Sequence, residues 1–310
     1  MKTNLRSLPK FRDGLSFLYV EHAVVEREAQ SVAVFSAAGR VSVPAAGLGT
    51  LLLGPGTRIT HAAMGALADC GCSVAWVGEG AMRCYAVGTG KSRSNRNLEA
   101  QARAFADAGL HLAVVRRMYQ LRFSEVVSAS LTLQQIRGKE GVRVREAYAA
   151  AAQEYGVAWT GRNYDPGSWS KADPVNRALS AGNACLYGVC QAGIHSAGFS
   201  TGLGFIHVGK QLSFVYDVAD LYKTSVVIPA AFQAAGEPKP ETAVRRLVRD
   251  RIVHENLLSR LLADLEWIFD LRGAEDADAD VVDNSPGELW DVTRLITGGQ
   301  QHAGDADDGA

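Results

Sequence analysis

Two aspartates and a histidine in the second half of the sequence have the types and spacing of a metal site. Asp217 and Asp220 stand three residues apart, which puts both carboxylates on one face of a helix, and Lys223 follows three residues later. His207 precedes them at a point where a turn could bring its imidazole toward the acids. Carboxylates with one imidazole form a hard site, which favours Mg²⁺ or Mn²⁺ over zinc. The alternative is that Asp217 only begins a helix and that Asp220 lies on a solvated face.

A further acid stands among bases earlier in the chain. Glu140 lies within Ile136–Arg145 and has four basic neighbours there: Arg137, Lys139, Arg143 and Arg145. Glu140 could simply neutralise these neighbours. It could instead be a third metal ligand, in which case the bases would hold phosphate groups against the metal.

The net charge of −1 hides an uneven distribution. From Glu275 onward ten acids face the single base Arg294, so the rest of the chain has 31 bases, 23 acids and a net charge of +8. Between Lys91 and Glu146 eleven bases face five acids, and nine of the eleven are arginine, the side chain best suited to forked phosphate contacts. The pattern indicates a nucleic-acid partner, although a solvated helix face would carry similar charge.

The candidate site residues fall in the part of the chain that has helical periodicity. Apolar residues recur there at three- and four-residue spacing, and the expected helices cover 97–108, 110–123, 131–155, 175–197, 213–222, 225–234 and 241–271. Between Arg177 and Lys210 the sequence has no Asp, Glu, Lys or Arg. Recurrent glycine and polar residues in this stretch favour a buried central helix over a membrane span.

The first ninety residues have the pattern of short strands. Segments rich in Val, Leu and aromatic residues at 15–21, 23–27, 31–36, 40–43, 48–53, 73–77 and 83–87 alternate with turn residues, and one helix is expected at 61–69 with Thr60 as its N-cap. The expected fold class is α+β, with a small β-rich domain at 1–90, a larger all-helical catalytic domain at 91–273, and an acidic, largely disordered tail at 274–310.

Other functions are disfavoured by the sequence. The segment Gly88–Ser92 resembles a phosphate-binding loop, but Tyr85 stands where that motif needs a glycine, so an interdomain linker is the better interpretation. The cysteines nearest to a zinc pattern, Cys70, Cys72 and Cys84, lack an evident fourth ligand and are better explained as buried thiols. The odd number of cysteines, five, and the polar, basic N-terminus predict a reducing cytoplasm and no export signal.

Several motifs, in collinear order over roughly residues 10–275, closely resemble the CRISPR-associated integrase family of type I-E systems. The matching segments are Gly56–His61, Trp76–Gly80, Arg137–Gly141, Tyr164–Pro166, Ser180–Gly188, Gly204–Lys210 and Phe214–Asp220. Separate motifs in the right order are specific evidence, whereas any one of them would be weak alone. The acidic tail lies outside the resemblance.

The resemblance implies a role for each candidate residue. Glu140, His207 and Asp220 would bind the metal, and Asp217 would support the site or assist a water molecule. Tyr19 falls near the aromatic residue that stacks on the end of the incoming duplex. Arg58 and Arg83 match family positions that contact DNA, and Lys210 and Lys223 would be phosphate neighbours of the metal. The bases around Glu140, expected to bind DNA on their charge, are Arg137, Lys139, Arg143 and Arg145.

The implied activity is insertion of double-stranded spacer DNA into a CRISPR array. A DNA 3′ hydroxyl would attack a phosphodiester of the repeat, and the metal would lower the pKa of that hydroxyl and screen the developing charge. The resemblance further implies a homodimer formed through the β-rich domains and a small second CRISPR-associated protein that bridges two dimers.

Two other functions remain open on the sequence. A stand-alone metal nuclease that cleaves branched DNA would use the same ligands with water as the nucleophile. A non-catalytic DNA-binding scaffold would keep the arginines but would not need Glu140, His207 and Asp220 together.

The tail predicts a separate role. Five of its apolar residues fall within Glu288–Ile296, in an otherwise acidic stretch. Such a segment suggests an element that becomes ordered on a partner surface. We expect it to dock on the second CRISPR-associated protein through Trp290; the alternative is that the tail folds back onto its own helical domain.

Overall fold

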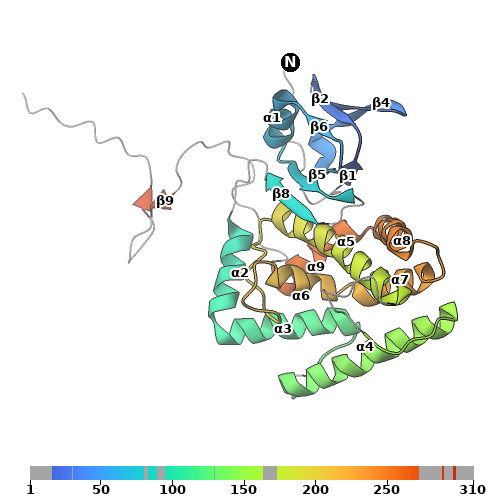
Figure 1. The fold of residues 1–310 in the computed structure, drawn as a ribbon. Helices are drawn as coiled ribbons and strands as arrows, with labels where there is room; N and C mark the ends of the chain where they lie inside the picture. The colour runs from blue at the N-terminus through green and yellow to red at the C-terminus, as the bar shows by residue number, and fades with distance from the viewer. Residues whose placement is uncertain are drawn as a thin grey trace, which may run out of the picture. The chain divides into compact units, whose positions relative to one another are not determined.

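The computed structural model of the chain describes residues 16–29, 31–79, 83–88, 95–128, 130–162, 173–271, 288–289 and 296–297. Residues 1–275 form one compact unit and residues 276–310 form a second. In the first unit a strand-rich part, blue and cyan in Figure 1, is followed by a part built of helices. This order confirms the predicted α+β fold class.

The first sheet contains strands from across the strand-rich part. Its order is β1 (Ser16–Val20), β5 (Leu48–Leu53), β7 (Ser73–Val77) and β8 (Cys84–Gly88). The first three are parallel, and β8 is antiparallel to β7. The central strand β5 is buried on both faces: Leu51 and Leu53 pack in the core of the strand-rich part, and Leu52 packs with the helices.

The second sheet has the order β4 (Gly39–Pro44), β3 (Ser31–Ser36), β2 (Val24–Glu28) and β6 (Arg58–Ile59). The strand β6 was not predicted, because two residues are too short to show an alternating pattern. Helix α1 (His61–Asp69) follows it. As predicted, α1 begins at Thr60, whose hydroxyl accepts a hydrogen bond from the backbone N–H of Ala63 at 3.3 Å.

The helical part follows the predicted order with one error. Its helices are α2 (Arg96–Ala106), α3 (Ala108–Phe123), α4 (Leu133–Tyr155), α5 (Pro174–Ser196), α6 (Ser213–Asp220), α7 (Ile228–Ala234), α8 (Pro240–His254) and α9 (Leu257–Ile268). The expectation of one helix over 241–271 is wrong. Asn256, with a left-handed φ of 48°, separates α8 from α9.

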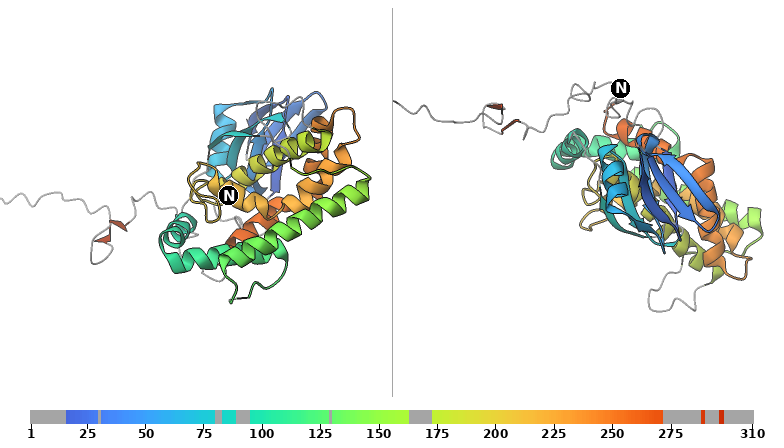
Figure 2. Two further views of the ribbon diagram at one scale, coloured as in Figure 1. Left: turned by 60° about the horizontal axis from the view of Figure 1, so that its bottom comes forward. Right: turned by 90° about the horizontal axis from the view of Figure 1, so that it is seen from above.

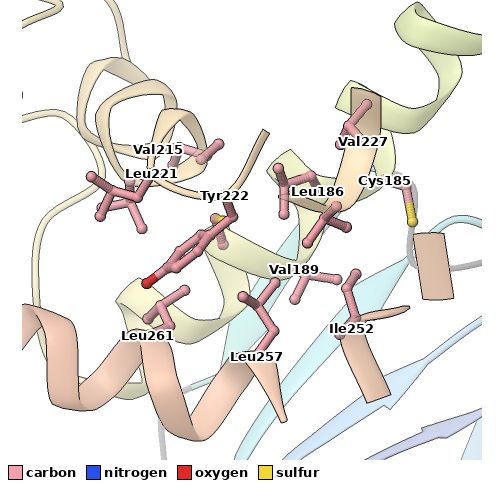
Figure 3. Packing of buried hydrophobic residues seen from close by; sticks show 14 of the residues in the cluster. Cys185, Leu186, Val189, Val215, Leu221, Tyr222, Val227, Ile252, Leu257 and Leu261 are labelled. Atoms are coloured by element: carbon pink, nitrogen blue, oxygen red, sulfur yellow. The ribbon is translucent and has the colours of Figure 1, made fainter. Parts of the chain in front are cut away.

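Helix α5 is the buried centre of the helical part. It contacts α6, α7, α8 and α9 as well as β5, β7 and β8, and Figure 3 shows part of this packing. A Cβ atom at Gly182 would lie 2.9 Å from Val227 Cγ1, and one at Gly193 would lie 3.1 Å from Leu258 Cδ2, so small residues permit the close approach. The uncharged stretch is therefore a core helix, and in the part of the chain that the structure describes no helix has the length and apolar character of a membrane span.

The two parts of the first unit are in contact. The hydroxyl groups of Thr50 in β5 and Ser196 in α5 lie 2.9 Å apart, and Arg245 in α8 lies 3.5 Å from Glu79. Figures 1 and 2 show α4 along the side of the helical part that faces away from the strands. The predicted domain boundaries at residues 90 and 273 stay predictions.

Some predicted features lie outside the described residues. They are most of the linker at 88–95, the Tyr164–Pro166 motif, and most of the acidic tail including Trp290. Within the second unit, β9 (Glu288–Leu289) pairs antiparallel with β10 (Ile296–Thr297). The predicted disorder of the tail stays a prediction.

Candidate functional site

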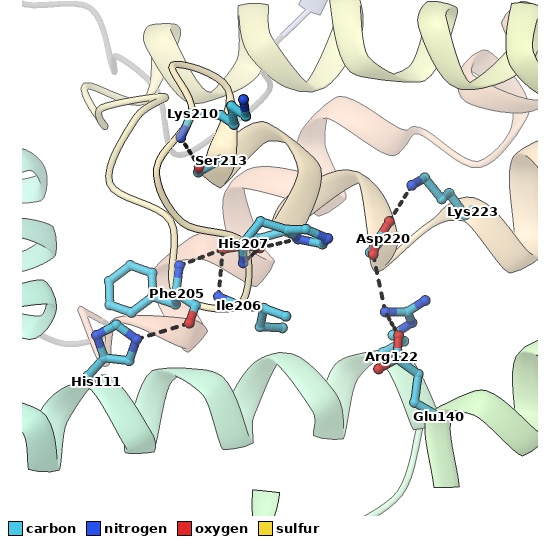
Figure 4. Close-up of polar contacts among 11 residues, drawn as sticks. His111, Arg122, Glu140, Phe205, Ile206, His207, Lys210, Ser213, Asp220 and Lys223 are labelled. Carbon is cyan, nitrogen blue, oxygen red and sulfur yellow. Dashed lines mark hydrogen bonds and ion pairs between the residues drawn. The ribbon is translucent and has the colours of Figure 1, made fainter. Parts of the chain in front are cut away.

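The four predicted site residues come from elements that meet at one place (Figure 4). Glu140 lies in the first half of α4, and Asp217 and Asp220 lie in α6. His207 lies in the connection between α5 and α6. The last turn of α3 adds Arg122, which was not predicted as a site residue.

Asp217 is fully buried and its carboxylate has four hydrogen-bond partners. The backbone N–H groups of Phe205 and Ile206 donate to Oδ2 at 2.6 and 3.1 Å. The backbone N–H and the ring Nδ1 of His207 each lie 2.8 Å from Oδ1. Hydrogen bonds to an ionised acceptor are among the stronger ones in proteins. Asp217 therefore fixes the loop Gly204–Lys210, called here the His207 loop, and its own oxygens are already occupied.

The contact with Asp217 orients the imidazole of His207. The hydrogen bond to that carboxylate raises the pKa of His207, and burial opposes the shift only in part. With Nδ1 donating to Asp217, Nε2 is the ring atom that remains to bind a cation. In Figure 4 the ring points toward Asp220. A carboxylate behind the imidazole is the usual arrangement of a metal-binding histidine.

Gly204 makes the tight His207 loop possible. A Cβ atom at this position would lie 2.1 Å from the carbonyl oxygen of His207 and 2.6 Å from Ser213 Cβ. No side chain fits in that space, so the glycine is required by the close approach of the backbone. The predicted motif Gly204–Lys210 therefore contains both His207 and the glycine that its tight loop requires.

Polar side chains of α2 and α3 hold the chain around this loop. The fully buried Gln101 accepts from the backbone N–H of Ser200 at 2.7 Å and donates to the carbonyls of Ser200 and Leu203 at 2.9 and 3.1 Å. The ring of His111 contacts the carbonyl oxygen of Phe205 at 3.0 Å. Sequence reasoning missed these residues, since their partners are about a hundred positions away in the sequence. The one available signal was a polar side chain, Gln101, on the apolar face of a predicted helix.

Asp220 contacts two cationic side chains. Lys223 Nζ lies 2.5 Å from Oδ1, and Arg122 Nη1 lies 3.4 Å from Oδ2. The same Arg122 nitrogen forms a second ion pair with Glu140 Oε1. One guanidinium therefore joins carboxylates from α4 and α6, as the dashed lines in Figure 4 show.

Burial and the charges of this cluster shift the pKa values of neighbouring side chains. Burial, with a contribution from Glu140, raises the pKa of Tyr119 to about 12. Burial would lower the pKa of Lys223, but Asp220 and Tyr187 oppose it and the net direction is upward, so the ammonium group stays charged. Lys223 also begins a π-helical turn, Lys223–Val227, of the kind often found at functional sites.

The residue types fit a hard divalent cation, but two of the expected ligands, Glu140 and Asp220, are paired with Arg122 in this structure. Among the described residues no group of three or more His, Cys, Asp or Glu side chains is close enough to hold a metal ion. Two carboxylates and a carboxylate-backed imidazole are nevertheless the donors expected for Mg²⁺ or Mn²⁺. Arg122 shows that Glu140 and Asp220 reach a common cation.

The predicted DNA-contacting bases are mostly exposed. Arg58, Arg83, Arg137, Lys139, Arg145 and Lys210 have exposed side chains, whereas Lys223 is partly buried against Asp220. Arg143 already has partners within the chain, since its guanidinium lies 4.6 Å over the Phe123 ring and 2.5 Å from Glu125. The hydroxyl of Tyr19 donates to Glu21 at 2.6 Å. The DNA contacts of all these residues stay predictions.

A second basic surface was missed by sequence reasoning. Arg245, Arg246 and Arg249 of α8 line an open cavity of about 510 Å³ that also has Glu21 and Glu79 in its wall. The arginines follow one another at helical spacing in the sequence, which was the signal that could have indicated them.

Known proteins match this chain in sequence and in fold. A family model described as CRISPR associated protein Cas1 matches residues 120–241, which contain Glu140, His207, Asp217 and Asp220. The CRISPR-associated endonuclease Cas1 2 of Thermus thermophilus is 55% identical over 306 residues, which cover 97% of this chain and 94% of that protein. The chain belongs to the Cas1 family.

Solved Cas1 structures agree with this assignment. The TtCas1-DNA complex has 57% sequence identity and a TM-score of 0.76, with 86% of this chain and 100% of that chain covered. A partial Cas6-RT-Cas1–Cas2 complex has 16% identity and a TM-score of 0.57, covers 86% of this chain and 98% of that chain, and shares the fold. The family and the class of CRISPR-associated endonuclease predicted from the sequence are confirmed.

Proposed function

We propose that this Cas1-family chain joins a DNA 3′ hydroxyl to a CRISPR repeat with Mg²⁺ or Mn²⁺ bound by Glu140, His207 and Asp220. The observation that carries the proposal is the shared cation between Glu140 and Asp220 beside an imidazole held by Asp217. The bound metal would supply Lewis-acid stabilisation of the phosphate charge and would lower the pKa of the attacking hydroxyl.

The chain's own residues supply binding and orientation. Asp217 holds His207 in place, and Lys223 compensates part of the charge of Asp220. The exposed bases of α4 and Lys210 in the His207 loop are suited to bind phosphate groups beside the carboxylates. A relative of 57% identity was solved as a complex with DNA, which supports DNA as the substrate here.

The test is a strand-joining assay with a labelled duplex and a plasmid that carries a CRISPR repeat. Joined product should require Mg²⁺ or Mn²⁺ and should disappear with a chelator. A duplex with dideoxy 3′ ends is the matched control, because it blocks joining but leaves hydrolysis possible. Shortened products without joined ones would indicate the metal-nuclease alternative, and binding without either product would indicate a scaffold.

Assembly into a homodimer through the strand-rich part belongs to the same proposal. Joining both ends of a duplex requires two active sites, and the second sheet has exposed apolar residues at Phe35 in β3 and Val41 in the outer strand β4. Replacing Val41 with Glu should convert the dimer to a monomer in light scattering, with the melting temperature little changed. A dimer of unaltered mass would place the interface elsewhere.

We also propose that a small second CRISPR-associated protein bridges two such dimers and binds the segment Glu288–Ile296. Deleting everything after Arg272 should weaken binding of that partner, measured by calorimetry, with little change in melting temperature. Unaltered binding, or a large fall in melting temperature, would mean that the tail belongs to the fold of this chain and not to the complex.

A further inference from the structure

The position between Glu140 and Asp220 is filled by an arginine of the chain itself. Arg122 Nη1 pairs with Glu140 Oε1 and lies 3.4 Å from Asp220 Oδ2. The side chain of Arg122 is only 9% exposed, and those of Glu140 and Asp220 are 22% and 13% exposed. Water therefore screens this cluster weakly, and its charges act strongly on one another.

A divalent cation would compete with Arg122 for the same oxygen atoms. Mg²⁺ binds carboxylate oxygens at about 2.0–2.1 Å from one centre, whereas here the Asp220 oxygen is 3.4 Å from the guanidinium nitrogen. An arginine in a protein does not lose its proton, so it cannot reduce the repulsion by becoming neutral. The metal and the guanidinium nitrogen cannot occupy the same position between these two oxygens.

The arginine also has a structural task when no metal is bound. Around Glu140, α4 has one buried apolar side chain, Ile136, whereas Ala147, Tyr148, Ala152 and Tyr155 pack against the core farther along the helix. Without a cation, the carboxylates of α4 and α6 would repel each other across the site. Arg122 in α3 links both helices to a third.

We propose that Arg122 is an internal cation that keeps Glu140 and Asp220 together in the metal-free protein, and that the metal must displace it in order to bind. The inference rests on the proposed metal site and makes Arg122 a positioning residue. Its side chain sets the metal affinity below the value that the three ligands alone would give. A neutral residue at this position strengthens metal binding and weakens the metal-free fold.

The test is a titration of the full-length protein with Mn²⁺, followed by electron paramagnetic resonance of the free ion. Arg122→Gln should lower the dissociation constant about tenfold or more, equivalent to about 1.4 kcal/mol. Arg122→Lys, which keeps the charge but lacks the fork, should lie between wild type and Arg122→Gln. Arg137→Gln is the matched control, since it removes one exposed positive charge from α4 close to Glu140 and should change the constant less than threefold.

Thermal melting gives a second readout. Without metal, Arg122→Gln should melt below wild type, and saturating Mn²⁺ should raise its melting temperature more than it raises that of wild type. If Arg122→Gln does not fold without metal, refolding in Mn²⁺ should restore it. Failure to refold, together with a wild-type dissociation constant for Arg122→Lys, would overturn the proposal.

The outcomes separate this inference from the proposed function. Equal dissociation constants for wild type and Arg122→Gln, with weaker binding in Glu140→Gln, would overturn the role of Arg122 and leave the metal site standing. Absence of Mn²⁺ binding in both wild type and Arg122→Gln would overturn the metal site and the inference together.

Discussion

The two aspartates of α6 share one helix face but are held in opposite ways. Asp217 is enclosed by three backbone N–H groups and a histidine ring, at distances of 2.6–3.1 Å. Asp220 meets the ends of two long side chains, Arg122 and Lys223. Backbone donors cannot move away, whereas long side chains can exchange for another cation. Within one turn, the helix combines a fixed support with an exchangeable charge site.

The largest expected effect is loss of strand joining when a proposed metal ligand is removed. Glu140→Ala, His207→Ala and Asp220→Ala should each reduce joining by about 10³-fold or more, since a bound metal supplies several kcal/mol of charge stabilisation. A gel-based joining assay measures this. Unchanged dimer mass should accompany the loss, because ligand removal leaves the core intact. An active Asp220→Ala enzyme at ordinary metal concentration would disprove the ligand assignment.

The second effect contrasts the two aspartates in stability. Asp217→Asn should lower the melting temperature by roughly 5–10 °C, because it leaves buried N–H groups without full partners, at about 1–3 kcal/mol. Asp220→Asn, the control at the other end of the turn, should change it by less than about 3 °C, since the amide oxygen can still accept hydrogen bonds from its cationic partners and no backbone N–H group loses an acceptor. Equal shifts in calorimetry would remove the distinction drawn between the two residues.

The smallest effect concerns the salt dependence of DNA binding. Replacing Arg137, Arg143 and Arg145 together with Gln should reduce the slope of log affinity against log salt by about 2, at about 0.9 for each phosphate contact. Arg143 should contribute least, because its guanidinium is already placed over Phe123. Lys210→Gln, in the His207 loop that Asp217 holds, should change the slope by about one at most. An unchanged slope in the triple variant would mean that α4 faces away from the DNA.

Local patterns were sufficient to predict most of the fold. The alternating segments and the Thr60 cap gave the strands and α1, since both signals depend on neighbouring residues. The break at Asn256 was missed, because the apolar spacing continues through it and one asparagine, although it adopts the left-handed conformation readily, is a weak signal by itself. The short β6 depends on its pairing with β2 and has no periodicity of its own.

The site was predictable only in its residue types. Spacing placed Asp217 and Asp220 on one face with His207 just before them, and Glu140 was one of two open interpretations. The resemblance to a known family then selected Glu140, His207 and Asp220 as the ligands. The pairing of Arg122 with both carboxylates joins positions 122, 140 and 220, and no local pattern indicates contacts over such separations. Gln101 is missing from the prediction for the same reason.

The π-helical turn Lys223–Val227 acts as a spacer that sets the register between two helices with different duties. Ile228 N–H donates to the carbonyl of Lys223, five residues back, so this turn contains one residue more than an α-helical turn. Loss of one residue here would restore ordinary spacing and leave α7 in register with α6, whereas insertion of one residue would rotate α7 by about 100° relative to α6. Such a rotation would turn the buried Phe232 outward and the exposed Gln233 inward. A single-codon insertion in this segment would therefore separate the site from its core, although every proposed ligand would remain in the sequence.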